Sequence, residues 1–425
     1  MKPINHQTPR RIGFVSTRFD DTDGVTLETV KWVEILERLG HICFFFAGAS
    51  AQPQERSFIV PEANFKHPEI EEINQIVFNL PTRPAEVSSH IHHIAKLLKE
   101  SLRRFVDVFD IDLLLVENAL AIPLNIPLGL AITEFISETG FPTIAHHHDF
   151  FWERKKFLVN SVWDYLNMAF PPHLPFIHHV VINSSAANQL SLRTGISSHL
   201  IPNVMDFDRP PAHVDHYADD LRAALGLQPG EKFLLQPTRV VQRKGIEHAI
   251  ELVHRLGMSA RLIISHASND EGFEYEQRVK DYARLLNVQV NFVADVIREH
   301  RGITPDGRKI YSLWDVYPQA DLVTYPSTIE GFGNAFLEAI YYRKPIVVNN
   351  YSIFAIDIKP KGFQVIEFDG YITQETVERT RQVLLNPDLA AEMSEHNFQL
   401  AKRHYSYAVL ERHLKTLLSE CFGEG

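Results

Sequence analysis

A glycine-rich turn between two glutamates lies within residues 324–342, in the sequence TYPSTIEGFGNAFLEAIYY. Glu330 and Glu338 flank the turn, with seven residues between them. Glycines let a ligand approach backbone N–H groups directly, and free N–H groups at a helix start favour an anion such as a diphosphate. The two carboxylates would accept hydrogen bonds from hydroxyl groups. The segment therefore predicts a pocket for a sugar joined to a phosphate, although an ordinary strand–turn–helix connection explains the turn alone equally well.

Two expected elements position this turn. A strand ends near Tyr325, and a helix follows over residues 334–342. We expect Asn334 to be the N-cap of this helix and Glu338 to lie in or near its first turn. The turn would then stand at the carboxyl end of a strand, where α/β folds bind ligands.

Two cations follow another expected strand, in the sequence QPTRVVQRKG at residues 236–245. Arg239 and Lys244 would lie in the turn at the carboxyl end of that strand. Two positive charges there would neutralise a diphosphate and stabilise a departing nucleotide as charge develops on it. For the third cation, Arg243, a solvated surface charge is the simpler interpretation.

Three consecutive histidines follow a short expected strand, in the sequence IAHHHDFFWERKKF at residues 144–157. Adjacent residues of an extended chain point in opposite directions, so His146, His147 and His148 cannot all bind one metal ion. We therefore expect no metal site here. The position after the strand places the histidines at the carboxyl edge of a sheet, facing the cleft expected between two domains.

Three basic residues, Arg154, Lys155 and Lys156, follow the histidines. They would suit a phosphorylated or acidic acceptor. A surface patch at a helix start explains them equally well.

Strand-like and helix-like segments alternate along the chain, which predicts parallel sheets. The expected strands cover residues 11–16, 41–47, 112–116, 142–145, 179–182, 232–236, 260–265, 288–293, 322–325 and 345–348. The expected helices cover residues 27–39, 245–256, 275–286, 334–342 and 407–422. The pattern restarts after a loop at 202–218, so we expect an α/β chain of two doubly wound, Rossmann-like domains, 1–205 and 206–404. Residues 295–309 are long for a connection and predict a functional loop.

Composition narrows the classes of protein. The formal net charge of −11 argues against a nucleic-acid partner, since a phosphate backbone requires a basic face. The two cysteines, Cys43 and Cys421, have no metal or disulfide spacing. Neither a signal-type apolar stretch at the N-terminus nor a membrane span is evident, which predicts a cytoplasmic protein and leaves peripheral membrane contact open.

Taken together, these motifs resemble the retaining glycosyltransferases of family 4, also called glycosyl transferases group 1, which have the GT-B fold. The two glutamates have the family's spacing around a GFG turn, and Arg239 and Lys244 have the spacing of its Arg/Lys pair. The segments VINS (181–184) and LIPNVMD (200–206) occupy the places where family members end the first domain. The resemblance covers most of the chain and is strongest from about residue 232 to 350.

The resemblance implies a role for each matching residue. Glu330 would lie by the transferred hexose, and Glu338 would bind the ribose hydroxyls of the nucleotide. The turn amides would meet sugar hydroxyls and phosphate; they belong to Gly331, Phe332, Gly333 and Asn334. His148, which Asp149 follows, would lie beside the donor sugar, with His146 as the second choice. The last helix, within 405–425, would pack back on the first domain.

The turn after the first strand, TRFDDTDGVT at residues 17–26, departs from the family, whose members carry one or two glycines there. Only Gly24 matches, and we expect it to let the backbone approach the donor phosphates. The acidic run at residues 20–23 suggests the Asp-x-Asp metal motif of the other major glycosyltransferase fold. Solvated loop charges are the better account, because the run directly follows the first strand.

We therefore expect a retaining hexosyltransferase that moves glucose or mannose from a nucleotide-diphosphate sugar to a sugar-like, small-molecule or glycan acceptor. Lys244 and Arg239 would assist the leaving group, and no cofactor or metal would be required. The alternatives on the same fold are a nucleotide-sugar epimerase, a phosphorylase and a non-catalytic nucleotide-sugar sensor. No pyridoxal-linked lysine supports the phosphorylase.

Overall fold

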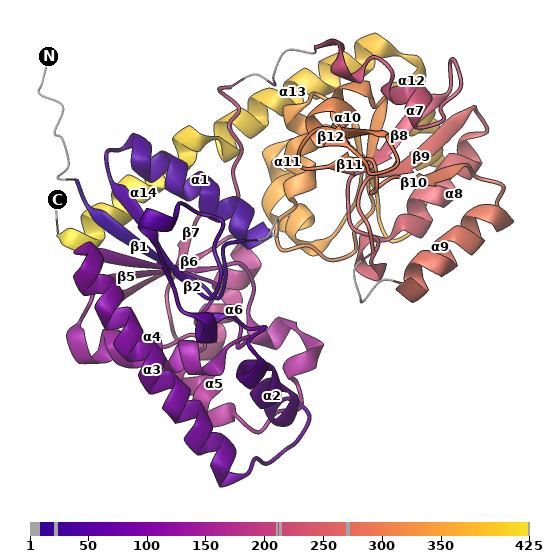
Figure 1. Ribbon diagram of the computed structural model, residues 1–425. Coiled ribbons are helices and arrows are strands. Elements are labelled where there is room, and N and C mark those ends of the chain that lie inside the picture. The colour runs from indigo at the N-terminus through magenta and orange to yellow at the C-terminus, as the bar shows by residue number, and fades with distance from the viewer. Residues whose placement is uncertain (1–8, 21–23, 210, 212–214, 269–272, 424–425) are drawn as a thin grey trace, which may run out of the picture. The chain divides into compact units, whose positions relative to one another are not determined.

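The computed structural model describes residues 9–20, 24–209, 211, 215–268 and 273–423. The chain forms two compact units (Figure 1). The first comprises residues 1–204 with 407–425, and the second comprises residues 205–406. Each unit is built on a parallel β-sheet, as the alternation of strands and helices predicts.

The first unit contains a seven-stranded sheet in the order β3-β2-β1-β4-β5-β6-β7, in which all neighbours are parallel. Its strands are β1 (Arg11–Val15), β2 (Ile42–Ala47), β3 (Ser57–Ile59), β4 (Leu113–Glu117), β5 (Thr143–His147), β6 (Ile177–Val181) and β7 (His199–Leu200). The order of strands reverses between β1 and β4. The carboxyl ends of strands at such a reversal are where open α/β sheets bind ligands.

Helices cover both faces of this sheet (Figure 1). They are α1 (Gly24–Arg38), α2 (Pro68–Val77), α3 (Ala85–Phe109), α4 (Ile126–Thr139), α5 (Trp163–Ala169), α6 (Ser184–Thr194) and α14 (Tyr407–Phe422). Val15 of β1 packs in one core with α3 and α4, whereas Phe14 packs in a second core with Trp32 of α1 and Leu414 of α14. Successive residues of a strand point to opposite faces, which explains why a continuously apolar strand needs helices on both sides.

The second unit contains a six-stranded parallel sheet in the order β10-β9-β8-β14-β15-β16. Its strands are β8 (Lys232–Gln236), β9 (Ala260–Ile264), β10 (Val290–Phe292), β14 (Leu322–Tyr325), β15 (Ile346–Asn349) and β16 (Ile366–Phe368). Its helices are α7 (Leu221–Ala224), α8 (Ile246–Leu256), α9 (Phe273–Leu285), α10 (Leu313–Gln319), α11 (Asn334–Tyr341), α12 (Gln374–Leu385) and α13 (Pro387–Tyr405). The strand order reverses between β8 and β14, the strands that the glutamate and cation motifs follow.

The segment expected to be a long functional loop, residues 295–309, instead forms part of a small three-stranded sheet. Its strands are β11 (Ile297–Arg298), β12 (Gly302–Ile303) and β13 (Lys309–Ser312), in the order β11-β13-β12. Arg301 links this sheet to neighbouring segments, because its guanidinium forms ion pairs with Asp215 at 2.6 Å and with Asp315 at 2.5 Å. The segment is therefore partly strand instead of an irregular connection, and its functional role stays a prediction.

Within the described ranges, none of the helices combines the length and the apolar character that crossing a bilayer demands.

Candidate active site

Four polar side chains converge at one edge of the second unit's sheet. Arg239 and Lys244 follow β8, His266 follows β9 and Glu330 follows β14. The strands β9, β8 and β14 are neighbours, so their carboxyl ends meet at the same edge. The structure thus brings together the two cations and the first glutamate that the sequence singled out.

Glu330 lies at the centre of this charged cluster. Its Oε1 accepts a hydrogen bond from Lys244 Nζ, and its Oε2 accepts one of 3.2 Å from Arg243 Nη1. Burial opposes the charge of Glu330, but the two cations hold its pKa below the ordinary value. Burial lowers the pKa of Lys244, and Glu330 counteracts that shift. Arg243 is therefore part of the site and not only a solvated surface charge.

Gly245 explains how Lys244 is held beside the end of β14. Gly245 has a φ of +58°, and a Cβ atom there would lie 2.4 Å from the carbonyl oxygen of Pro326. The next residues of the β14 turn are fixed by Thr328, whose N–H donates a 2.8 Å hydrogen bond to the Arg243 carbonyl. Only glycine allows the two turns to approach this closely.

The turn before α11 also depends on a glycine. Gly333 has a φ of +126°, and a Cβ atom would lie 2.8 Å from Tyr351 Oη and 3.1 Å from Tyr325 Oη. Gly333 is the N-cap of α11 and Asn334 is the first helical residue, so the prediction that Asn334 caps this helix is wrong. Tyr351 and Tyr325 explain why the N-cap is a glycine, because their hydroxyl groups leave no room for a side chain at this position.

The remaining residues of the predicted turn differ in exposure. Gly331 is exposed and Phe332 is buried, and the Phe332 carbonyl accepts a 2.8 Å hydrogen bond from Tyr351 Oη. Glu338 lies in the second turn of α11, not the first. Its Oε2 accepts a 2.7 Å hydrogen bond from Tyr317 Oη.

Arg239 and His266 complete this edge. The side chain of Arg239 is exposed, and within the described ranges it forms no salt bridge. A 2.8 Å hydrogen bond joins His266 Nδ1 to Ser265 Oγ. Burial, Lys244 and Arg239 together lower the pKa of His266 to about 4, so its ring is neutral at pH 7.

A second cluster lies at the carboxyl ends of β4 and β5 in the first unit. Glu117 is the register partner of His146 across these strands. Its Oε2 lies 3.0 Å from His146 Nδ1 and 3.2 Å from His148 Nε2. The side chains of Glu117 and His146 are fully buried, and 10% of the His148 side chain is exposed to solvent.

The charges of this cluster follow from its geometry. Burial opposes the charged form of Glu117, but His146 and His148 lower its pKa to about 2. Burial also opposes protonation of His148, yet the bond to Glu117 holds the pKa of His148 above its ordinary value. Burial keeps the pKa of His146 below its ordinary value. The cluster thus pairs an ionised Glu117 with His148, whose protonated form the carboxylate favours, next to a buried His146 that stacks on Trp32 with ring centroids 4.3 Å apart.

The third histidine points away from this cluster, as strand alternation predicts. His147 Nε2 lies 2.9 Å from His179 Nδ1, and both rings are buried. Burial lowers the pKa of His147 well below its ordinary value. His147 therefore packs inside the first unit and takes no part in the cluster.

Asp149 and Arg154 extend the cluster beyond the strands. The side chain of Asn118 accepts a 3.1 Å hydrogen bond from the His148 N–H and donates one of 3.1 Å to Asp149. Asp149 Oδ2 in turn lies 2.5 Å from Arg154. Arg154 is thus engaged with Asp149, whereas Lys155 is exposed.

The turn after β1 is described in part. Gly24 is the exposed first residue of α1, and nothing lies within 4 Å of the position that its Cβ would take. Of the acidic run at residues 20–23, only Asp20 falls within the described ranges. The space around Gly24 is open to a ligand.

The first-unit cluster has the donor set of a metal site as well as that of an ion pair. The ligand atoms of Glu117, His146 and His148 all lie within 4.8 Å of one another. The prediction of no metal site rests on the three histidines alone, whereas in the structure His146 and His148 converge with Glu117. This geometry is compatible with a metal ion as well as with the ion pair between Glu117 and His148.

Sequence reasoning missed four residues of these two clusters: Glu117, Asn118, His266 and Tyr317. A signal existed for Glu117 and Asn118, which end the expected strand 112–116 with polar side chains after a run of leucines. His266 lies in SHASN, where the family usually has a glycine-rich turn. Tyr317 has no local signal, since its partner Glu338 is 21 residues away.

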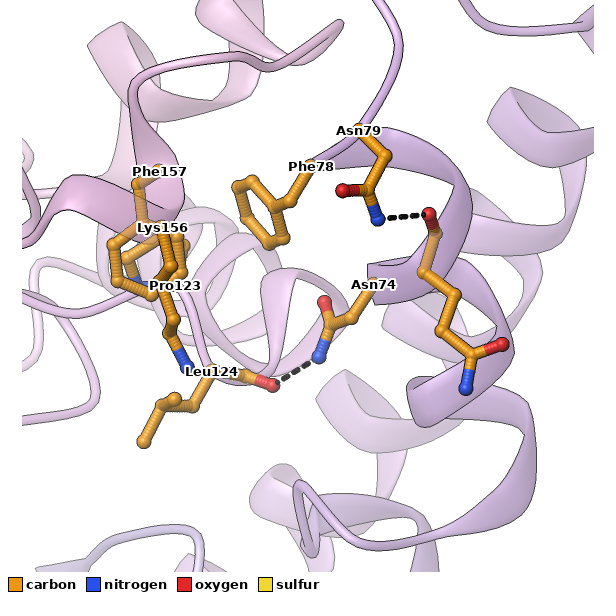
Figure 2. Close-up of a pocket in the computed structure, with 8 residues that line it drawn as sticks. Asn74, Phe78, Asn79, Pro123, Leu124, Lys156 and Phe157 are labelled. Carbon is orange, nitrogen blue, oxygen red and sulfur yellow. Dashed lines mark hydrogen bonds between the residues drawn. The ribbon is translucent and has the colours of Figure 1, made fainter. Parts of the chain in front are cut away.

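A separate hollow of about 250 Å³ lies in the first unit (Figure 2). Its lining comes from α2, the segment before α4 and the basic stretch: Asn74, Gln75, Phe78, Asn79, Pro123, Leu124, Lys156 and Phe157. Two hydrogen bonds in its wall join Asn74 to the Leu124 carbonyl and Asn79 to the Gln75 carbonyl. Of the predicted site residues, Lys156 lines this hollow, whereas its neighbours Arg154 and Lys155 do not.

Known proteins share both the sequence and the fold. The family described as Glycosyl transferases group 1 matches residues 218–399. The mannosylglucosylglycerate synthase of Thermotoga maritima is 32% identical, covering 94% of this chain and 98% of the relative. That of Petrotoga mobilis is 31% identical, covering 84% and 86%.

Two solved structures illustrate the likeness in fold. A glycosyltransferase from Rickettsia africae has a TM-score of 0.70 at 14% identity, covering 99% of this chain and 100% of that one. Anabaena HepE, solved in complex with UDP and glucose, has a TM-score of 0.65 at 13% identity, covering 97% and 100%. At this identity the two structures bear on the fold alone.

Each of the two α/β units has a parallel sheet with a polar cluster at its strand ends. This architecture defines a glycosyltransferase of the GT-B class. The chain belongs to the family Glycosyl transferases group 1 and is an enzyme that transfers a glycosyl group. The family and the fold class expected from the glutamate and cation motifs are both confirmed.

Proposed function

We propose that this enzyme transfers a mannosyl group from a nucleotide-diphosphate mannose to glucosylglycerate. The observation that carries the proposal is the similarity over nearly the whole of both chains to a mannosylglucosylglycerate synthase. That name states the product, and adding a mannosyl group to glucosylglycerate yields it. Of the two hexoses expected from the resemblance, mannose is the one we propose.

The second unit would bind the nucleotide diphosphate. Arg239 and Lys244 supply positive charge at the carboxyl edge of the sheet, and Glu330 balances that charge before the donor arrives. The carboxylate of Glu338, whose Oε2 accepts a hydrogen bond from Tyr317 Oη, would accept a hydrogen bond from a ribose hydroxyl. The exposed Gly331 and the turn to Asn334 would bring backbone amides to the sugar and phosphate.

The transfer would retain the anomeric configuration by front-face attack. The bond between the mannosyl C1 and the diphosphate oxygen breaks, and a bond from C1 to an acceptor hydroxyl oxygen forms on the same face. The acceptor's proton passes to the departing phosphate oxygen, so the products are the nucleoside diphosphate and the new glycoside. Lys244 and Arg239 would stabilise the charge that grows on the phosphate.

The first unit would position the mannosyl group and the acceptor. We assign contact with the hexose to His148, because it retains exposure, whereas His146 is buried beneath it and orients Glu117. The carboxylate of glucosylglycerate requires a cation. The exposed Lys155 would bind this carboxylate. Arg154, which forms an ion pair with Asp149, would lie next to it. Gly24 would admit the donor phosphates to the backbone of α1.

We propose that no metal acts at the diphosphate, since cations and amides already serve it. A chelator should therefore leave transfer intact. Activity lost in chelator and restored by Mg²⁺ or Mn²⁺, but not by Zn²⁺, would contradict this part of the proposal and would direct attention to the acidic run at 20–23.

The proposed reaction can be tested with the purified full chain. Mannose and glucose donors carrying uridine, guanosine or adenosine diphosphate are each supplied with glucosylglycerate, with glucosyl-3-phosphoglycerate or with no acceptor. The phosphorylated acceptor is included because a further relative, 27% identical, is a mannosylglucosyl-3-phosphoglycerate synthase. We expect mannosylglucosylglycerate from a mannose donor and the unphosphorylated acceptor, identified by mass and NMR.

Other outcomes of the same assay identify the alternatives. Conversion of the donor without an acceptor would indicate an epimerase or a hydrolase. Binding of a donor, seen as a rise in melting temperature, without turnover of any combination would indicate a sensor. Preference for the phosphorylated acceptor would leave the mannosyl transfer in place and replace the proposed acceptor.

A further inference from the structure

A group of metal-ligating side chains lies in the first unit, apart from the residues assigned to the reaction. It consists of His178 on β6, His199 on β7 and Glu420 in the last turn of α14. Glu420 Oε2 lies 3.1 Å from His199 Nε2 and 3.6 Å from His178 Nδ1. Three segments that are distant in the sequence therefore direct their ligand atoms to one point.

The sheet register explains why the two histidines meet. His199 is the register partner of Val180 on the neighbouring strand. His178 lies two residues before Val180, so both imidazoles stand on the same face of the sheet. Val180 belongs to the core that α14 covers, together with Leu417. The last turn of α14 then places Glu420 over the two rings.

The spacing suits a tetrahedral ion. Zn²⁺ binds imidazole nitrogen and carboxylate oxygen at about 2.0–2.2 Å, which places tetrahedral ligand atoms roughly 3.3 Å apart. The contacts of 3.1 Å and 3.6 Å bracket that value, and all three ligand atoms lie within 4.8 Å of one another. The side chains are 29–42% exposed, so an ion can enter from solvent and water can occupy a fourth position.

We propose that His178, His199 and Glu420 bind a Zn²⁺-type cation that fastens the end of α14 to the edge of the first unit's sheet. Two imidazoles and one carboxylate are a donor set that Zn²⁺ accepts, and Mg²⁺ or Ca²⁺ would require more oxygen ligands. β7 is the edge strand of the sheet and is only two residues long, so few backbone bonds hold it. An ion joining β6, β7 and α14 would stabilise both the edge strand and the terminal helix.

The test is a Zn²⁺ titration of the metal-free full chain by calorimetry, with the chain first dialysed against chelator. We expect the wild type to bind Zn²⁺, and His199→Ala and Glu420→Gln to weaken that binding at least about tenfold. Glu420→Gln preserves the shape of the side chain, and circular dichroism confirms that each variant is folded. His90→Ala removes a comparable partly exposed histidine–glutamate contact, with Glu69, and serves as the matched control.

His148→Ala locates the ion, because Glu117, His146 and His148 form the other candidate metal-binding group among the residues that the structure describes. Zn²⁺ binding that survives in the His199 and Glu420 variants but is lost in His148→Ala would overturn the proposal, as would failure of the wild type to bind. Hydrogen exchange tests the fastening itself. Bound Zn²⁺ should slow exchange of α14 amides in the wild type and not in Glu420→Gln, and equal exchange with and without Zn²⁺ would overturn that role.

Discussion

Glu117 determines the charge state of the histidines beside it. Its carboxylate is fully buried, where an unpaired charge is costly, so it must be compensated by the two rings it touches. The bond to Glu117 holds the pKa of His148 above its ordinary value, whereas burial holds that of His146 below it. A glutamate on the neighbouring strand therefore favours the protonated, hydrogen-bond-donating form of the side chain proposed to contact the hexose.

Replacing Glu117 with glutamine should lower the pKa of His148, because the neutral amide no longer favours the imidazolium. The imidazole signals of uniformly ¹⁵N-labelled protein, followed by NMR across pH 5–9, report this directly. Glu69→Gln, which removes the carboxylate beside His90 elsewhere in the first unit, is the matched control and should leave His148 unchanged. An unaltered His148 titration in Glu117→Gln would show that the carboxylate does not set its charge.

The same substitution should alter stability in a defined pH window. The pKa of Glu117 is lowered from 4.5, so its contribution is present above pH 4.5 and is lost as the pH falls toward 2. The pKa of His148 is raised from 6.5, so its contribution is complete below pH 6.5 and is lost as the pH rises through the folded-state value. The stability difference between wild type and variant, roughly 3 kcal/mol, should be largest between pH 4.5 and 6.5 in urea unfolding.

Replacing Arg239 should change the rate of the reaction without changing the stability of the protein. Its side chain is exposed, so Arg239→Ala should change the free energy of unfolding by no more than about 0.5 kcal/mol. If it stabilises charge on the departing phosphate, turnover should fall by about a hundredfold. The control is Arg278→Ala, which removes another exposed arginine from α9. Equal rates for the two variants would remove Arg239 from the reaction.

At the scale of elements, the glycine at the start of α11 determines the shape of the donor turn. Gly333→Ala should destabilise the second unit by about 1–3 kcal/mol, since a residue with a Cβ is strained at a φ of +126° and would contact Tyr351 Oη. Gly24→Ala is the matched control, because its Cβ would meet nothing within 4 Å. Urea unfolding should separate the two variants, and equal stability would contradict the assigned role of the Gly333 backbone.

Most strands of the two large sheets were predictable because they are short apolar runs with a polar residue at the end, whereas β3, β7 and β16 were not predicted. β8 and β14 have the bounds expected from their sequences, at 232–236 and 322–325. The 25-residue helix α3 was not predicted, although its buried side chains from Ile91 to Phe105 recur at helical spacing. Charged residues and histidines between them obscure that pattern. The sheet at 297–312 was missed because strands of two to four residues are too short to show a periodicity.

The site was predictable only where a local motif carries it. Glu330, Lys244 and the glycine turn lie close together because β8 and β14 are neighbours, and the chain signals each strand end. Glu117 could not be assigned, since its importance depends on a register partner 29 residues away. The helix cap was misplaced for a similar reason, because Tyr351 and Tyr325 exclude a side chain at Gly333. Such tertiary contacts have no local signature.

At the scale of the whole molecule, the last helix of the chain completes the first unit. α14 follows α13 of the second unit after a single residue, yet its leucines pack with Trp32 of α1. The first unit therefore buries this face of its sheet only when α14 is packed on it. Each unit contributes residues that we assign to one reaction, so the stereochemical course of that reaction tests the assignments in both.

An α-linked donor should give an α-linked product. An inverting transferase requires a general base opposite the leaving group to activate the acceptor for in-line attack. In front-face attack the departing phosphate takes the acceptor proton, and Arg239 and Lys244 stabilise that phosphate while it is both leaving group and base. His148→Ala should then slow transfer without changing the anomer, because His148 positions the sugar and does not select the face. Proton NMR of the fresh product reads the anomer, and a β-linked product would contradict the proposed mechanism together with the roles of these three residues.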